Sequence, residues 1–475
     1  MELDDDRQGV FSFSPEVAAS FGARREAHIS QGVEDPVILD PAAQSIKLNL
    51  FQQVMALWEE AGPYNAACLF QLRGQANFAA LQDAIRESCQ QAGLGKLALN
   101  PKGQSCRYDP AETIRLDQIE SGNRARETLC EILTEQMNMP FPHQPHHPIR
   151  WAVLNDPHTD SHFLVTVWRH IAADAVSIRL LVRRVLARYY GATHAFSEAP
   201  LRAHPPDYSR GMRRHHRRLG YLRTLMRSGR LYLRLRSVYR LPESKDRGGG
   251  SRILLFDTPP DLIRRLARAC RARQVSVNDA FLAALGSAIA EMTPSRQAQR
   301  RRRGLALATA VDIRRMAAEE FADCFGLFVG HWVTLMDAPD SSDREGALAE
   351  IARQTRLEKA EQRFAGPAWN FLTLLLLRRW LSVNEDRSWY RKVYPLSAGL
   401  SNVRMSSAEF PGGKENILAY FLVPPTGPAL PLVVSPATLD DQLKLSAVYR
   451  EASLSESQVR ILIDLFIKKL ESFSS

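Results

Sequence analysis

The sequence lacks any apolar run long enough to cross a lipid bilayer. Its longest apolar stretches, such as residues 371–377, fall far below the roughly 20 residues that a spanning helix needs. It also lacks a secretory signal at its start, because residues 1–6 are mostly acidic where a signal begins with positive charge. These absences predict no membrane span and a cytoplasmic location.

Paired cysteines are absent too. The six cysteines form no C-x-x-C pair, so the spacing predicts neither a disulfide framework nor a zinc site, and we expect reduced, mostly buried thiols. Three histidines, His143, His146 and His147, are the remaining metal candidates. They stand in a proline-rich loop without carboxylate or cysteine partners, so we predict no metal site there.

The positive charge is concentrated in one segment. The chain has 475 residues and a net charge of +10, and residues 201–240 contain twelve arginines against one acid, Asp207. Such a segment attracts anionic partners, including acidic proteins, phosphorylated cofactors and anionic lipid. Nucleic acid is a poor candidate, because no basic-aromatic binding motif accompanies the arginines.

The same segment contains regularly placed apolar residues, which leaves two interpretations open. Parts of it are amphipathic, so contact with an anionic membrane surface is one possibility. A solvated helix whose long arginine stems cover apolar surface is the other. The apolar residues are Leu219, Leu222, Leu225, Met226, Leu231, Leu233 and Leu235.

Strand and helix patterns alternate along both halves of the chain, which predicts an α/β protein with two lobes. We expect helices over residues 45–60, 78–91, 124–137 and 176–190, and buried strands over 149–154 and 162–168. A strand over 253–257 and a helix over 260–273 open the second half. The expected organisation is a loose leader (1–35), an N-terminal lobe (36–205), an arginine-rich connector (206–249) and a C-terminal lobe (250–475).

The most informative segment joins the strand over 162–168 to the following helix. It contains His170 and, four residues later, Asp174. A histidine at a strand end is held rigidly and can face a cleft, as a general base should. The spacing by itself also fits a buried structural histidine, and Asp174 also fits an N-terminal helix cap.

The surrounding residues resemble the condensation-domain family of nonribosomal peptide synthesis and its acyltransferase relatives. The likeness extends in order over roughly residues 40–472, and Arg169-His170-Ile-Ala-Ala-Asp174-Ala175 falls where the family has His-His-x-x-x-Asp-Gly. Other matching elements are Tyr64-Asn65, Met139-Pro140-Phe141, Pro148-Ile149-Arg150, Pro206-Asp207-Tyr208, Val277-Asn278-Asp279-Ala280, Val311-Asp312-Ile313-Arg314, Phe325-Gly326-Leu327-Phe328-Val329 and Leu400-Ser401-Asn402.

Three positions depart from the family pattern. Arg169 replaces the first His, Ala175 the terminal Gly, and Gly330 the Asn expected after Phe328-Val329. The second His, to which the family assigns the proton, is kept as His170. Arg169 could hold that ring neutral if it lay beside it, or it could point to the opposite face of the strand.

The resemblance implies two chloramphenicol-acetyltransferase-like subdomains that form a V-shaped pseudo-dimer with a tunnel at their interface. The implied reaction is attack of an amine or hydroxyl on an acyl thioester, with His170 as general base and no bound cofactor. The donor would be a phosphopantetheine thioester, on a carrier protein or coenzyme A.

The resemblance also assigns supporting residues. It makes Arg314 the expected ion-pair partner of Asp174. Ser401, Asn402 and Gly330 are the candidate residues of the tunnel or substrate site. Because of the departures at Arg169 and Gly330, a catalytically degenerate recruitment or docking module is the alternative.

Overall fold

The computed structural model describes most of the chain from residue 45 to 474. The described residues are 45–100, 105–110, 113–120, 124–156, 158–192, 202–203, 221–244, 249–314, 324–337, 343–360, 390–392 and 394–474. The expected leader, the apolar stretch 371–377, the Pro206-Asp207-Tyr208 element and much of the arginine-rich segment lie outside them.

The first half of the chain is built on a five-stranded sheet of order β15-β2-β7-β6-β5. Neighbouring strands are antiparallel except β5 and β6, which are parallel. The central pair, β2 and β7, is in register from Asn65 opposite Arg169 to Arg73 opposite Ser161. The strands are β2 (Asn65–Arg73), β5 (Leu116–Ile119), β6 (Ile149–Asp156), β7 (Ser161–Arg169) and β15 (Ile417–Val423).

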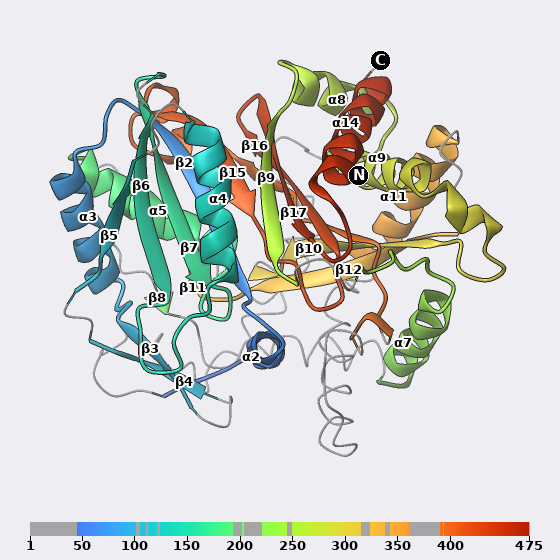
Figure 1. Cartoon of the computed structure of the whole chain (residues 1–475), viewed down its shortest axis with the longest axis horizontal. Helices are drawn as coiled ribbons and strands as arrows, with labels where there is room; N and C mark the ends of the chain where they lie inside the picture. The colour runs from blue at the N-terminus through green and yellow to red at the C-terminus, as the bar shows by residue number, and fades with distance from the viewer. Residues whose placement is uncertain are drawn as a thin grey trace, which may run out of the picture. The chain divides into compact units, whose positions relative to one another are not determined.

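Helices cover both faces of this sheet (Figure 1). On one face, α3 (Phe78–Gln91) and α5 (Ala175–Tyr189) pack against each other and against the strands. On the other face, α4 (Ala125–Asn138) packs between the sheet and β9 (Ser251–Asp257) of the second half. The sequence patterns therefore predicted these helices and strands to within one or two residues at most ends.

The first helix begins later than expected. The pattern predicted a helix over residues 45–60, but α2 is Leu50–Glu60, and Ile46–Lys47 form strand β1. The Asn49 side chain accepts a hydrogen bond from the backbone N–H of Gln52, and Gln52 Oε1 accepts one from the backbone N–H of Asn49. This reciprocal capping sets the start of α2 at Leu50, because it satisfies the backbone N–H groups of Asn49 and Gln52, which have no partner within the helix.

The first half also contains a small three-stranded sheet of order β1-β4-β3. Both of its strand pairs are antiparallel. Its longer strands are β3 (Lys96–Leu99) and β4 (Ser105–Asp109).

The second half is built on a seven-stranded sheet of order β12-β10-β13-β16-β17-β9, with β14 also paired to β16. Helices α8 (Leu262–Ala272), α9 (Val277–Met292), α11 (Arg344–Ala360) and α14 (Glu456–Phe473) gather beside it and share one apolar core with its strands (Figure 1). The strands are β10 (Leu305–Asp312), β12 (Val329–Met336), β13 (Ala398–Leu400), β14 (Val403–Met405), β16 (Leu432–Leu439) and β17 (Gln442–Arg450).

The two halves exchange elements. β15 belongs to the second half by sequence, yet it pairs antiparallel with β2 of the first sheet from Ile417 opposite Leu72 to Val423 opposite Ala67. A second link pairs β8 (Arg202–Ala203) in parallel with β11 (Cys324–Phe325).

The helices also bear on the membrane prediction. Within the described residues, no single helix is long and apolar enough to span a bilayer. The pair α8 and α9 meets the criterion only together, is bent by 105° between its members, and contains the almost fully buried α9.

Candidate functional site

His170 lies directly after the end of β7, where the chain turns toward α5. Its backbone N–H donates to the carbonyl of Tyr64, 3.2 Å away, which ties the turn to the start of β2. The imidazole is partly buried and stacks on the Tyr64 ring, with centroids 5.5 Å apart and planes 17° from parallel. Strand end, neighbouring strand and aromatic ring therefore hold the imidazole in one orientation.

The carbonyl oxygen of Ala173 determines which nitrogen of His170 carries the proton. It lies 3.0 Å from Nδ1 of His170 and also accepts a hydrogen bond of 2.9 Å from Nε1 of Trp168. A carbonyl can only accept, so Nδ1 must be the protonated nitrogen. The other nitrogen, Nε2, then carries the lone pair that a general base uses.

Burial lowers the pKa of His170 below its ordinary value, and the Ala173 carbonyl and the charge of Asp174 oppose this only in part. Removing the ring from water penalises the charged imidazolium more than the neutral form. The ring is therefore neutral at neutral pH, which a proton acceptor requires.

Arg169 is paired with a carboxylate on another element. Its guanidinium binds Glu59 of α2, with Nε 3.0 Å from both carboxylate oxygens and Nη2 2.6 Å from Oε2. Arg169 is the last residue of β7, and adjacent strand residues point to opposite faces. Glu59 therefore balances the arginine that stands in place of the family's first histidine.

Asp174 combines the two roles that the sequence left open. It caps the N-terminus of α5, since Oδ1 accepts a 2.9 Å hydrogen bond from the backbone N–H of Ser177. The same carboxylate receives both terminal nitrogens of Arg314, at 2.7 and 2.8 Å, and the backbone N–H of Phe328 at 2.8 Å. The expected pairing with Arg314 is thus present.

The Asp174–Arg314 pair is almost completely shielded from water. Its side chains are 3% and 2% exposed, and the guanidinium also donates to Ser177 Oγ at 2.6 Å and lies over the Phe328 ring. Burial by itself would raise the pKa of Asp174, but the Arg314 charge and the hydrogen bonds hold it below its usual value. The pair stays ionised and ties the His170 loop to the second half of the chain.

Backbone contacts reinforce this link. The backbone N–H of Asp174 donates to Gly326 at 3.0 Å, and Ser177 Oγ bonds both the carbonyl and the N–H of Gly326. Gly326 belongs to the Phe325-Gly326-Leu327-Phe328-Val329 element. The sequence did not indicate the roles of Ser177, Glu59 and the Ala173 carbonyl. Each acts through a contact with a residue far along the chain or through its backbone.

The other candidate residues are Ala175, Gly330, Ser401 and Asn402. Ala175 is the first residue of α5 and does not have positive φ, so the structure accepts a side chain there. Gly330 is buried in β12 opposite Val311 of β10. Ser401 and Asn402 join β13 to β14, and no hydrogen bond links either of them to His170 in the described part of the chain.

Other matched elements have structural contacts. Arg150 donates to the carbonyls of Met139 and Pro140 and lies 3.9 Å from the centre of the Phe141 ring, so the two proline-containing elements are in contact. No cluster of three metal-ligating side chains occurs among the residues that the structure describes. His146 and His147 each place Nδ1 against a backbone carbonyl.

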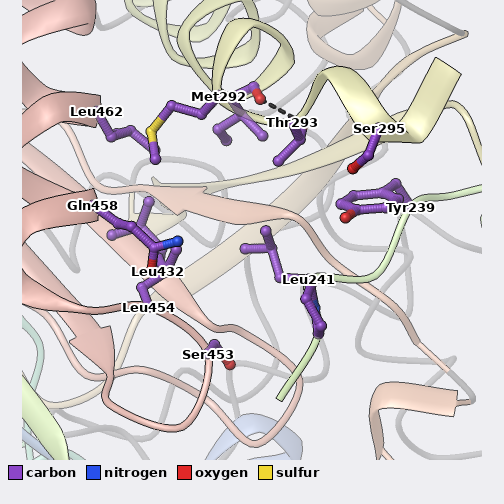
Figure 2. Close-up of a pocket in the computed structure, with 12 residues that line it drawn as sticks. Tyr239, Leu241, Met292, Thr293, Ser295, Leu432, Ser453, Leu454, Gln458 and Leu462 are labelled. Atoms are coloured by element: carbon purple, nitrogen blue, oxygen red, sulfur yellow. Dashed lines mark hydrogen bonds between the residues drawn. The ribbon is translucent and has the colours of Figure 1, made fainter. Parts of the chain in front are cut away.

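A cavity of about 150 Å³ lies elsewhere, in the second half of the chain, between α9, α14 and the start of β16 (Figure 2). Its lining is mainly apolar, with Leu241, Met292 and Leu462 among the labelled residues, and Tyr239 and Ser295 are also part of it. No residue of the His170 loop lines it.

Comparison by sequence finds no relatives: no model of a known protein family matches the chain, and no curated protein does. Comparison by structure gives many. The first condensation domain of the calcium-dependent antibiotic synthetase, in complex with a substrate analogue, superposes with a TM-score of 0.68 at 15% identity, covering 91% of this chain and 97% of that one. The chain has the condensation-domain fold. The expected α/β architecture of two chloramphenicol-acetyltransferase-like lobes is thereby confirmed.

Domains other than condensation domains are also similar to this chain in structure. The epimerization domain from the third module of tyrocidine synthetase B matches with a TM-score of 0.60 at 17% identity, covering 94% of this chain and 98% of that one. The X-domain, solved in complex with OxyB from teicoplanin biosynthesis, matches with a TM-score of 0.57 at 17% identity, covering 94% and 96%. Likeness of fold therefore does not by itself determine an activity.

Proposed function

We propose that this chain transfers an acyl group from a phosphopantetheine thioester to an amine or hydroxyl, with His170 as the general base. The observation that carries the proposal is the Ala173 carbonyl, which fixes the proton of the neutral imidazole on Nδ1 and leaves Nε2 free to accept another. The lowered pKa of His170 favours the same neutral state.

In this mechanism Nε2 of His170 takes the proton of the nucleophile as its nitrogen or oxygen bonds to the thioester carbon. The carbon–sulfur bond then breaks, and the phosphopantetheine thiolate leaves and recovers a proton from the imidazolium. No covalent enzyme intermediate is needed. Asp174 and Arg314 would act as positioning residues, since their contacts hold the loop rather than reach the imidazole.

A phosphopantetheine thioester is supported as donor by the structural neighbours. The starter condensation domain of rhizomide synthetase was solved with an acyl-coenzyme A and an aminoacyl thioester analogue, C8-CoA and Leu-SNAC. That domain matches this chain with a TM-score of 0.62 at 14% identity. For this chain, a carrier protein and coenzyme A are both proposed sources of the arm.

The test is an acyl-transfer assay with loaded carrier protein and acyl-coenzyme A side by side, using a panel of amine and alcohol acceptors. His170→Ala should lower kcat by roughly 10²–10⁴-fold, the usual contribution of a general base. His158→Ala, in an exposed turn of the same half, is the matched control and should retain wild-type turnover. Equal turnover of the wild type and His170→Ala, with both folded, would exclude the catalytic role.

The pH dependence gives an independent check. Because burial lowers the pKa of His170, the acid limb of the rate profile should fall below the ordinary histidine value of about 6.5. An acid limb at or above that value would show that the imidazole is not the shielded base proposed here.

A recruitment or docking module is the second candidate. Arg169, locked onto Glu59, replaces one family histidine, and the similar X-domain was solved as a complex with another protein. For such a module, His170→Ala would leave binding to its partner protein and the biological output unchanged. The two candidates therefore predict opposite results for one variant.

A further inference from the structure

Helix α7 (Tyr221–Leu235) packs on the protein through residues near its C-terminal end. Leu235, which is 1% exposed, joins a small apolar cluster with Ala306 of β10 and Leu335 of β12, and Leu231 packs against the same cluster. Arg234 adds a 2.8 Å ion pair to Asp337. One side of the helix is thus firmly attached, and Figure 1 shows α7 at the periphery of the described chain.

The rest of the α7 surface exposes large apolar side chains. Met226 is 54% exposed, Tyr232 47% and Leu233 62%, which is half of the large exposed apolar residues that the structure describes. Met226 and Leu233 are seven residues apart, or two helical turns, and therefore lie on the same side. Exposed apolar residues concentrated on one element in this way mark a binding surface.

The charge of the helix has a single sign. Residues 221–235 contain four arginines and no acid, and the sequence has no acid from residue 208 to residue 242. Arg230 is exposed and follows Met226 by one turn, so it stands on the same stripe as Met226 and Leu233. Arg234 follows Arg230 by a further turn.

The single sign of charge on α7 favours one kind of occupant of this face. Apolar side chains beside arginines, with no acid among residues 208–242, are the pattern of a helix that lies on an anionic lipid surface, and Arg230 stands between the two apolar residues Met226 and Leu233. At a lipid surface the same side chain can extend to the phosphates while Met226 and Leu233 enter the acyl boundary.

We propose that the outer face of α7, defined by Met226, Arg230 and Leu233, binds the surface of an anionic lipid bilayer. The helix would lie in the plane of the interface, held by apolar insertion and by attraction between arginine and lipid phosphate. Its inner side, fixed through Leu235, would keep the rest of the protein at a constant orientation to that surface. This inference does not depend on the acyl-transfer reaction.

The test is co-sedimentation of the full chain with vesicles of phosphatidylcholine alone and of phosphatidylcholine mixed with phosphatidylglycerol. The wild type should bind the mixed vesicles, bind the neutral ones much less, and dissociate as salt rises. The double variant Met226→Glu/Leu233→Glu should lose roughly tenfold or more in affinity. Arg230→Ala should lose about fivefold, the equivalent of one basic residue at an anionic surface.

A matched control comes from α14. Ile461 is 55% exposed, close to Met226, but it stands on a different helix. Ile461→Glu should bind vesicles like the wild type, and thermal unfolding should show that every variant remains folded. The proposal is overturned if the wild type ignores mixed vesicles, or if the double variant binds them as well as Ile461→Glu does. In either case an acidic protein becomes the better candidate for this face.

Discussion

Arg169 and Glu59 form an ion pair that links the end of β7 to the last turn of α2. Three nitrogen–oxygen distances lie between 2.6 and 3.0 Å, and the side chains are only 10% and 15% exposed. A lone guanidinium at this depth would be costly, whereas a forked pair with a carboxylate satisfies it. The pair explains how the chain accommodates arginine beside its central histidine.

Removing one member of this pair should destabilise the fold. We expect Glu59→Gln and Arg169→Gln each to lower the free energy of unfolding by about 1–3 kcal/mol, because each leaves a shielded charge without its partner. The double variant should lose less than the sum of the two. Urea unfolding of all four proteins measures this coupling, and strictly additive losses would show that the pair contributes nothing.

The Asp174–Arg314 pair should make stability depend on acid. The fold lowers the pKa of Asp174 below its value in the unfolded chain, which is near 4. The stabilisation from the ionised carboxylate is therefore complete above the unfolded pKa and is lost as pH falls through the folded pKa. Asp174→Asn should remove this dependence and cost about 3–5 kcal/mol at neutral pH, because Arg314 stays buried.

Asp312→Asn is the control for that experiment. Asp312 also contacts Arg314, at 3.2 Å, but its side chain is 44% exposed. Its replacement should cost much less than Asp174→Asn. A comparable loss would mean that the two carboxylates share the guanidinium equally.

Ala175→Gly restores the family residue at the end of the motif, yet it should destabilise this protein. Ala175 begins α5 with ordinary helical backbone, where glycine loses more conformational entropy than alanine. We expect a loss of up to about 1 kcal/mol in thermal or urea unfolding. A gain in stability would contradict the helical assignment of this residue.

His331, in β12, should make the fold less stable as the solution is acidified. Burial lowers its pKa to about 4, so it stays neutral in the fold while the unfolded chain takes up a proton near pH 6.5. Stability from this residue is therefore intact above pH 6.5 and declines as pH falls toward 4. Unfolding measured across that range should show a shallower decline in His331→Gln, while His158→Gln should follow the wild type.

Local patterns predicted α2, α3, α4, α5 and α8 and a few of the strands, because burial on one face imposes a visible period on the sequence. The start of α2 was missed since Ile46 and Leu48 are buried as a helix face would be, although they precede the Asn49 cap. Capping depends on side-chain hydrogen bonds, which apolar spacing does not reveal.

The site was only partly accessible from sequence. The strand end pointed to His170, and the resemblance pointed to Arg314 as the partner of Asp174. The partner of Arg169 could not be predicted, because Glu59 is 110 residues away and any of many surface carboxylates would have fitted. The tautomer of His170 depends on a backbone carbonyl, which every residue has.

The pairing of β15 with β2 has a consequence for how this protein can be divided. A fragment ending before residue 206 would leave β2 as a bare edge with unsatisfied N–H and C=O groups, and such edges recruit other chains. The remaining fragment would present β15 without its neighbour. Neither fragment should be obtainable alone as a well-behaved monomer, whereas co-expression of both should recover an associated pair.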